Sequence, residues 1–389
     1  MKAFLLNSPA TLLALVAAAL LSLGTVMVYS ASGARAGFEA RRVLAQQEQL
    51  PPERLQFHHD KAYLVRQAIW AVAGIVMMIA LIKTPIETLE KYAPLILLGA
   101  FVLLLLVLVT PLGVTVKGAR RWLRLGPVTI QPSEFAKLAL VVYMAAYLSR
   151  KREEIRDWKK GFAPSVAVWG GFAVLVLLER DLGTIVLMGT VVTGMWVLAR
   201  VKVAHVATLI LASLPVLVFM ILSHSYRINR ILAFLDPEKY ALSHAFQLNQ
   251  SLIAIGSGGL WGRGLGLGIQ KYHFLSEAHT DFIFATVCEE MGFIGAAAVV
   301  LLFLAFALTG FRVSYRAPDY FGGLVAAGLT LTIVCAAFIN FAVVAGMAPT
   351  KGLALPFFTY GGSALVSTLM AVGILINVAN YTSVSHGGE

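Results

Sequence analysis

Acidic residues are concentrated in SEAHTDFIFATVCEE, residues 276–290, where a strongly apolar segment begins. The stretch contains Glu277, His279, Asp281, Glu289 and Glu290. Charge is costly in lipid, so an ionisable residue at the edge of a membrane segment is a functional hypothesis by default. The arrangement favours chemistry at a membrane boundary, with Asp281 as the best-placed acid.

These five residues cannot all line one site. If a helix begins near Glu277, Asp281 lies one turn further on the same face, at the outer boundary of a span. Glu289 and Glu290 lie about 12 Å deeper along such a helix and point elsewhere, which favours interhelical pairing or hydrogen bonding for both. His279 lacks the His/Cys spacing of a zinc site. A divalent cation on carboxylates, Mg²⁺ or Mn²⁺, remains open.

The composition indicates which kind of structure positions these residues. Of 389 residues, 59% are hydrophobic and 13% charged, and the mean hydropathy is +0.80. A soluble domain carries about a quarter charged residues. The chain is therefore expected to be a single all-α polytopic membrane domain, because helices satisfy their own backbone in lipid. Ten spans are predicted, at about 10–31, 63–82, 94–111, 134–149, 163–178, 183–199, 203–222, 281–309, 322–346 and 360–380.

The basic residues of the short loops predict the orientation. With a cytoplasmic N-terminus, the short inner loops hold twelve Lys and Arg and the short outer loops hold six. An excess of positive charge marks the cytoplasmic side, so both termini are expected there. The longest connection, 223–280 between spans seven and eight, is then extracytoplasmic. Its mixed apolar and polar residues are typical of interfacial helices.

The formal charge of +11 indicates an anionic partner, either membrane lipid or substrate. Nucleic acid is not expected, because the basic residues are scattered among loops. Both cysteines, Cys288 and Cys335, lie in apolar runs and are read as buried thiols. The first apolar run, about 10–29, is too long for a signal peptide and is read as an uncleaved span.

A second polar group lies in KGARRWLRLGPVTIQPSEFAKLAL, residues 117–140. Ser133 after Pro132 is a plausible helix N-cap. Lys137 follows Glu134 by three residues, so the two can pair on one face. A structural ion pair and a contact with a ligand are equally compatible with this spacing.

Three further motifs have structural and functional interpretations. Asp181 in ERDLGT suits a helix N-cap better than a substrate or metal contact. The segment GSGGLWGRGLGLG lacks the GK[ST] of a Walker loop, but its glycines permit close approach to a membrane or a ligand. PTKGLALPFFTYGGSA places Lys351 and Tyr360 on the same side as Asp281.

Several of these motifs, in this order, resemble the SEDS family of polytopic peptidoglycan glycosyltransferases, with PTKGLALPF closer to its division branch than to its elongation branch. The matching segments are MVYSAS, GARRWLRLGPVTIQPSEFAKL, DLGT, NQSLIAIGSGGLWGRGLG, EAHTDFIFA, EEMGFIG and PTKGLALPFFTYGGSA. Two positions depart from the family pattern, because Arg180 and Ser276 stand where proline is common.

The resemblance implies ten membrane helices, polymerisation of lipid II into β-1,4 glycan strands, and Asp281 as the essential acid. It implies a class B penicillin-binding protein and other divisome membrane proteins as partners, and the bacterial plasma membrane at the septum as location. No organic cofactor is implied. By motif matching or position it makes these residues candidates for contacting substrate: Arg120, Arg121, Trp122, Glu134, Lys137, Asp181, His279 and Lys351.

On this reading, Asp281 acts as general base toward the acceptor hydroxyl group, and cations balance the departing lipid pyrophosphate. One base and a good leaving group favour a single inverting displacement. A lipid II flippase is the main alternative, and a non-catalytic scaffold is a third. The absence of a visible inverted repeat and the position of Asp281 at one face count against transport.

Overall fold

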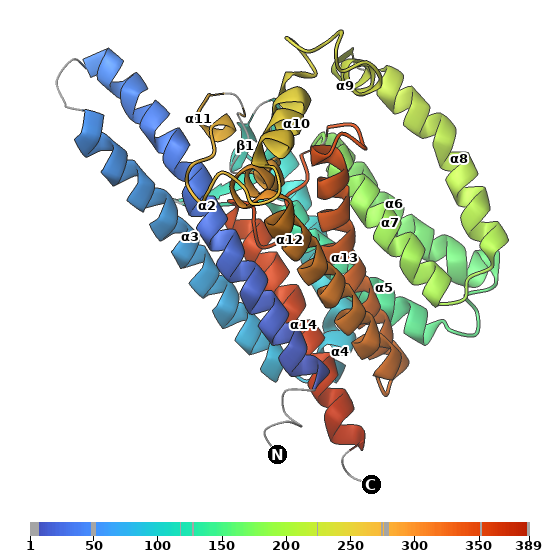
Figure 1. Ribbon diagram of the computed structural model, residues 1–389. Coiled ribbons are helices and arrows are strands. Elements are labelled where there is room, and N and C mark those ends of the chain that lie inside the picture. The colour runs from blue at the N-terminus through green and yellow to red at the C-terminus, as the bar shows by residue number, and fades with distance from the viewer. Residues whose placement is uncertain are drawn as a thin grey trace.

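The protein folds as a bundle of long helices (Figure 1). The computed structural model describes residues 8–47, 52–116, 118–126, 128–223, 225–273, 275, 280–350 and 352–386. Each of the ten predicted spans falls on a helix. These helices are α2 (Pro9–Gln47), α3 (Pro52–Lys83), α4 (Ile86–Val109), α5 (Pro132–Arg150), α6 (Ala163–Leu178), α7 (Leu182–Leu198), α8 (Val203–Leu222), α12 (Ile283–Arg316), α13 (Tyr320–Val344) and α14 (Gly362–His386).

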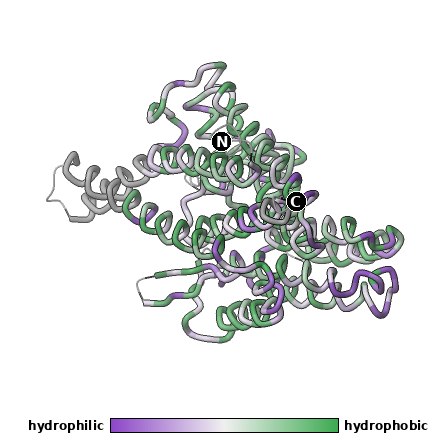
Figure 2. The backbone as a smooth tube through the Cα atoms, turned by 90° about the horizontal axis from the view of Figure 1, so that it is seen from below, coloured by the Kyte–Doolittle hydropathy of each residue, from purple (hydrophilic) through white to green (hydrophobic). Residues whose placement is uncertain are grey.

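The helices are those of a multi-pass membrane protein. Among the described residues, eight are long and apolar enough to cross a bilayer. Of the other two, α7 is apolar but shorter, and α5 carries Glu134, Lys137 and Arg150. Hydrophobic residues cover most of the helical tube, and hydrophilic residues gather in connections (Figure 2). The count of ten spans and their orientation stay predictions.

The centre of the bundle is formed by α13 and α14, whose most apolar windows are 67% and 83% buried. α14 packs along α3, and α12 packs along α13. The first residues of α2 and the last of α14 lie at the same end (Figure 1). We call the opposite end, which carries Asp281, the outer end, after the orientation that the charges predict.

A small sheet at the outer end was not predicted. Strands β1 (Gly113–Val116), β2 (Ala119–Leu125) and β3 (Val128–Ile130) form an antiparallel sheet in the order β1-β2-β3. The sheet joins α4 to α5. The strands are short, and glycines lie in the turns between them. They therefore lack the long alternation of apolar and polar residues that predicts strands.

The long connection 223–280 is largely helical in the part that the structure describes. It contains α9 (Ser225–Leu235), α10 (Phe246–Gly258) and α11 (Gln270–His273). A five-residue π-helix, Trp158–Phe162, precedes α6 near the other end of the bundle. The mixed polar and apolar residues of 223–280 therefore do form helices, as their spacing indicated.

α12 differs from the continuous helix that the sequence predicted. A turn occupies 280–282, so α12 begins at Ile283 instead of near Glu277. The helix is also broken at Gly292, which has φ 65° and ψ −166°. This conformation is left-handed and suits glycine, which has no Cβ. α12 therefore consists of a short first segment, 283–291, and a long second segment, 293–316.

Candidate functional site

Asp281 lies in the turn before α12, half-buried at the outer end of the bundle. The loop between α13 and α14 covers it. Gly352 of that loop is so close that an added methyl group would lie 2.8 Å from Oδ2 of Asp281. The Thr359 hydroxyl of the same loop donates to the carbonyl oxygen of Thr280, at 3.4 Å. The loop thus lies against the Asp281 side chain and is bonded to the main chain of the preceding residue.

Asn340 is the functional candidate that sequence reasoning missed. It lies on α13, is 1% exposed, and its Nδ2 donates to the main-chain oxygens of Asp281 and Leu353, each at 2.8 Å. One amide group therefore ties the acid to the loop that carries Gly352. A single polar residue within the apolar run CAAFINFAVV was the available signal, because a buried amide needs partners.

The same loop continues into a small hollow between α5, α13 and α14. Its lining includes the polar side chains of Glu134, Lys137, Thr332 and Ser367 among apolar ones such as Ala354 and Pro356. Lys137 pairs with Glu134 at 2.9 Å, and Ser367 Oγ donates to Oε2 of Glu134 at 3.2 Å. The predicted pairing of Glu134 with Lys137 is confirmed. The Lys137 ammonium group donates to Oε1 of Glu134 and has further N–H donors that a ligand could use.

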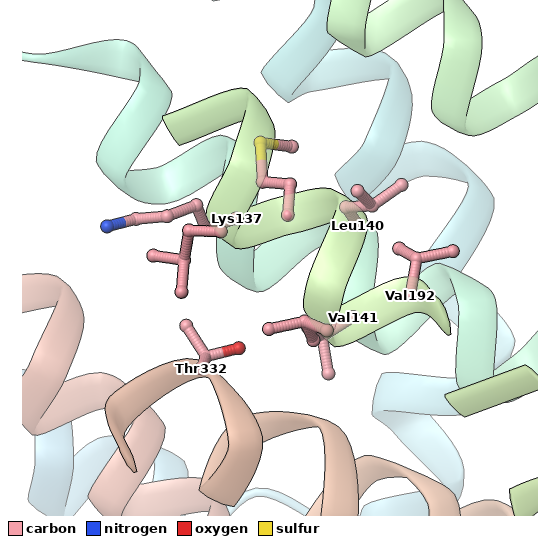
Figure 3. A pocket seen from close by; sticks show the side chains of 8 residues that line it. Lys137, Leu140, Val141, Val192 and Thr332 are labelled. Atoms are coloured by element: carbon pink, nitrogen blue, oxygen red, sulfur yellow. The ribbon is translucent and has the colours of Figure 1, made fainter. Parts of the chain in front are cut away.

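Lys137 also borders a second, apolar hollow between α5, α7 and α13 (Figure 3). Its other lining residues are Leu140, Val141, Leu187, Met188, Val191, Val192 and Thr332. The Lys137 side chain thus lines both hollows.

Asp181 caps α7 through its side chain. Its carboxylate accepts from the main-chain nitrogen of Thr184 at 3.2 Å and from the Thr184 hydroxyl at 3.0 Å. Arg121 approaches the same carboxylate at 3.6 Å. The Leu353 side chain lies against Gly183, so the cap adjoins the loop that covers Asp281. The structural interpretation of Asp181 is confirmed.

Arg121 binds the turn between α6 and α7. Its guanidinium donates to the carbonyl oxygens of Glu179, at 3.1 Å, and Arg180, at 2.5 Å. Arg180 itself has φ 63°, a left-handed conformation that proline cannot adopt. Arg121 supports that strained turn.

Arg120 and Trp122 belong to β2. Arg120 donates to the Thr110 carbonyl oxygen, and its Nε is buried without a hydrogen-bond partner. Trp122 faces Val114 across the β1–β2 pair. The guanidinium groups of Arg120 and Arg121 thus both bind carbonyl oxygens of the protein. A substrate contact for these three residues stays a prediction.

Glu179 is a buried acid in the turn between α6 and α7. Its side chain is inaccessible to solvent, and neither carboxyl oxygen has a hydrogen-bond partner. Burial and, to a smaller extent, the nearby Asp181 raise its pKa from 4.5 to about 8, against the opposing effect of Arg121. The outer end therefore contains a carboxyl group that is mostly protonated near neutral pH.

Glu289 and Glu290 are buried and paired, as preferred from the sequence. Glu289 accepts from the main-chain nitrogens of Ile269, at 2.8 Å, and Gln270. Glu290 forms a buried ion pair with Lys271 at 2.6 Å and accepts from Ser30 of α2. Their partners are α2 and the segment around α11. Both acids attach this segment to α12.

His279 and Lys351 lie outside the described residues, as do Glu277 and Ser276. Among the residues that are described, no three His, Cys, Asp or Glu side chains gather into a metal site. The described donor set therefore does not form a cation site, and a divalent metal stays a prediction.

Relatives extend over nearly the whole chain. A probable peptidoglycan glycosyltransferase FtsW of Geobacter metallireducens is 42% identical over 365 residues, covering 94% of this chain and 93% of the relative. Stage V sporulation protein E of Bacillus subtilis is 38% identical, covering 97% and 98%. Further similar proteins, 37–40% identical, also carry the name FtsW.

Solved structures share the fold. A chain of a peptidoglycan synthase complex superposes with a TM-score of 0.75 at 28% identity, covering 95% of this chain and 97% of that chain. The rod shape determining protein RodA of Thermus thermophilus gives 0.66 at 26% identity, covering 95% of each chain. The model of the FtsW/RodA/SpoVE cell cycle proteins matches residues 10–384. The chain therefore belongs to the FtsW/RodA/SpoVE family of cell cycle proteins.

Proposed function

We propose that this protein is a peptidoglycan glycosyltransferase of the division branch, which polymerises lipid II into β-1,4 glycan strands at the septum. The observation that carries the proposal is the placement of Asp281. It is a half-buried acid, held by Asn340 and covered by a loop that leads into a hollow beside Lys137. The names of the FtsW relatives support the activity and the branch.

In this mechanism, Asp281 accepts the proton of the acceptor hydroxyl group as that oxygen attacks the anomeric carbon of the donor sugar. The bond from that carbon to the pyrophosphate oxygen breaks, and undecaprenyl pyrophosphate leaves with the bonding electrons. Attack from the side opposite the leaving group inverts the anomeric carbon. The leaving group is already a stable anion, so no general acid is required.

Lys137 lines a hollow next to the loop that covers Asp281, and we assign it to the lipid-linked donor. A phosphate of that donor would accept a hydrogen bond from the Lys137 ammonium group. Glu134 neutralises the charge of Lys137, so this residue serves as a positioned donor with little net charge. Lys351 and a divalent cation are further candidates for balancing the pyrophosphate charge.

A class B penicillin-binding protein is the proposed partner, and the likeness to a chain of a peptidoglycan synthase complex supports it. The activity should therefore be measured with the cognate transpeptidase present. Wild type, Asp281→Asn and Asp236→Asn would be compared for glycan strand formation from lipid II, with and without Mg²⁺ or Mn²⁺. Asp236 is the control, because it is an exposed aspartate that accepts from the Lys239 main-chain nitrogen.

We expect strands from wild type and Asp236→Asn and none from folded, partner-bound Asp281→Asn. Normal polymerisation by Asp281→Asn would exclude the base. If none of the three proteins makes strands, the flippase alternative is tested next by lipid II transport in sealed vesicles. Loss of septal growth without loss of elongation on depletion would distinguish the division branch from an elongation polymerase.

A further inference from the structure

The glycine-rich segment Gly258–Ile269 is joined to the break in α12 through main-chain hydrogen bonds. The nitrogens of Arg263 and Gly264 donate to the carbonyl oxygens of Glu289 and Glu290, each at 3.0 Å. In return, the nitrogens after the break, at 293 and 294, donate to the carbonyl oxygens at 259 and 260, at 2.9 and 3.2 Å. The segment thus satisfies polar groups that the broken helix leaves unpaired.

Glycine is needed for this close approach. A Cβ at Gly258 would overlap the Cys288 carbonyl oxygen, and one at Gly262 would overlap that of Glu290. Two carboxylates add to the attachment, because Glu289 accepts from the Ile269 nitrogen and Glu290 from the Gly266 nitrogen. The segment is therefore fixed to α12 at both ends, and its depth is tied to that of the helix.

The segment nevertheless exposes large apolar side chains. Trp261 is 80% exposed, and three leucines are 59–67% exposed, namely Leu260, Leu265 and Leu267. Phe293 and Ile294, the first residues after the break, are also exposed, at 67% and 46%. The hydrogen bonds above make the two exposed groups neighbours, so the exposed apolar surface of α12 continues onto the segment.

The length of α12 places this apolar surface at the edge of the bilayer. About 20 helical residues cross the hydrocarbon core. Counting back from Arg312, the first charged residue toward the other end, 20 positions reach Gly292. The break and the segment bonded to it therefore lie where hydrocarbon meets headgroups. Tryptophan is enriched at that depth, because its ring is apolar and its N–H is polar.

We propose that Gly258–Ile269 is an interfacial anchor, which places Trp261, Leu260, Leu265 and Leu267 in the outer lipid leaflet beside α12. The exposed Arg263 lies among them and can reach the phosphate groups of the lipids. Because the segment and the first part of α12 are one hydrogen-bonded unit, the anchor sets the height of that unit relative to the membrane. The turn with Asp281 leads directly into this unit.

The proposed occupant of this surface is lipid. If a partner protein covered the surface instead, the surface would contact water when the protein is alone in a membrane, and the two cases can therefore be distinguished. The full-length protein would be reconstituted in lipid nanodiscs after Cys288→Ala and Cys335→Ala, which remove both native cysteines. Single cysteines at Trp261→Cys or Leu267→Cys would carry an environment-sensitive fluorophore. Leu301→Cys, an exposed position in the middle of the α12 span, serves as lipid-facing control, and Lys239→Cys, an exposed position between α9 and α10, serves as water-facing control.

Quenching by spin-labelled lipids and by aqueous iodide then reports depth. We expect the labels at 261 and 267 to resemble the label at 301 in their lipid quenching, at least about threefold stronger than at 239, with correspondingly weaker iodide quenching. If both labels follow the water-facing control in the nanodisc, the surface does not face lipid and the proposal is overturned. Normal folding of each labelled protein is checked by its thermal unfolding profile.

Discussion

Asn340 and Asp281 are joined by a hydrogen bond of 2.8 Å from the buried amide of the first to the main-chain oxygen of the second. The same amide nitrogen also binds the Leu353 carbonyl oxygen. The acid therefore depends for its position on a residue that belongs to the central helix α13. This dependence distinguishes Asn340 from a residue that supports only the fold.

Asn340→Ala is expected to lower turnover strongly while the protein remains folded. Loss of both bonds frees the turn, and a displacement of about 1 Å can cost roughly a hundredfold in rate. The matched control is Asn377→Ala, because Asn377 on α14 likewise donates to two carbonyl oxygens, those of Leu81 and Thr84. Both variants should lose about 1–3 kcal/mol of stability. Equal turnover per folded molecule in the two variants would contradict the positioning role.

Gly352→Ala should impair the reaction more than the fold. Its methyl group would lie 2.8 Å from Oδ2 of Asp281, closer than ordinary contact allows. The carboxylate must then move or lose access to the acceptor, and we expect at least about a tenfold loss in kcat. Gly361→Ala is the control in the same loop, because its methyl group would meet Ala364 at an ordinary 3.8 Å. Polymerisation assays of both variants decide the point.

The Arg180→Gly variant should be more stable toward unfolding than the Arg180→Ala variant. Both variants lose the hydrogen bond from Arg180 to the Gly118 carbonyl oxygen. Only glycine relieves the left-handed backbone at φ 63°, which costs other residues about 1–2 kcal/mol. Arg180→Pro should be worst, by about 3 kcal/mol or more, because proline cannot reach this φ. Thermal unfolding in detergent gives the order of stability of the three variants. Equal stability of the glycine and alanine variants would show that the backbone at residue 180 is not strained.

The buried carboxyl group of Glu179 predicts a pH dependence of stability. Its pKa is about 8 in the folded protein, against 4.5 when unperturbed. As pH rises between these values, the unfolded chain releases the proton and the folded protein retains it, so unfolding becomes easier. The loss is at most about 1.4 kcal/mol per pH unit and ends above the folded pKa.

Glu179→Gln lacks this proton, so its stability should fall less than that of wild type between about pH 5 and about pH 8. Unfolding midpoints across that range test it. Parallel curves for the two proteins would show that Glu179 does not titrate differently in the folded state.

The buried pair of Lys271 and Glu290 should behave differently from an exposed pair. Lys271→Met alone leaves a buried carboxylate without its cation and should cost about 3–5 kcal/mol. Adding Glu290→Gln should recover much of that loss. The exposed pair of Lys151 and Glu154, at 2.8 Å, is the comparison and should couple by less than about 1 kcal/mol. Double-mutant cycles on both pairs give the two coupling energies.

The membrane helices were predictable because bilayer thickness determines how many apolar residues a span needs. Helix ends that coincide with charge or proline, such as Pro132 and Arg150 of α5, were predicted within two residues. The break at Gly292 was not predicted, since an isolated glycine in an apolar run has no distinctive local pattern. It depends on main-chain bonds to a segment about thirty residues earlier.

The site was predictable where a residue's neighbours lie within one turn. Glu134 with Lys137, and the cap by Asp181, are contacts of this kind. Asn340 binds across 59 residues of sequence, which no local pattern reveals. Likewise, the sequence shows that Arg121 is basic but cannot show that main-chain carbonyl oxygens occupy its donors.

The low burial of α8 predicts how its sequence should vary among related proteins. Only 6% of its most apolar window is buried within the protein, and it stands at the side of the bundle (Figure 1). A surface that contacts fluid hydrocarbon selects for apolarity and length, and not for the shape of individual side chains. Leucine, isoleucine, valine and phenylalanine should therefore interchange freely along α8 during evolution, whereas α14 should accept few such exchanges.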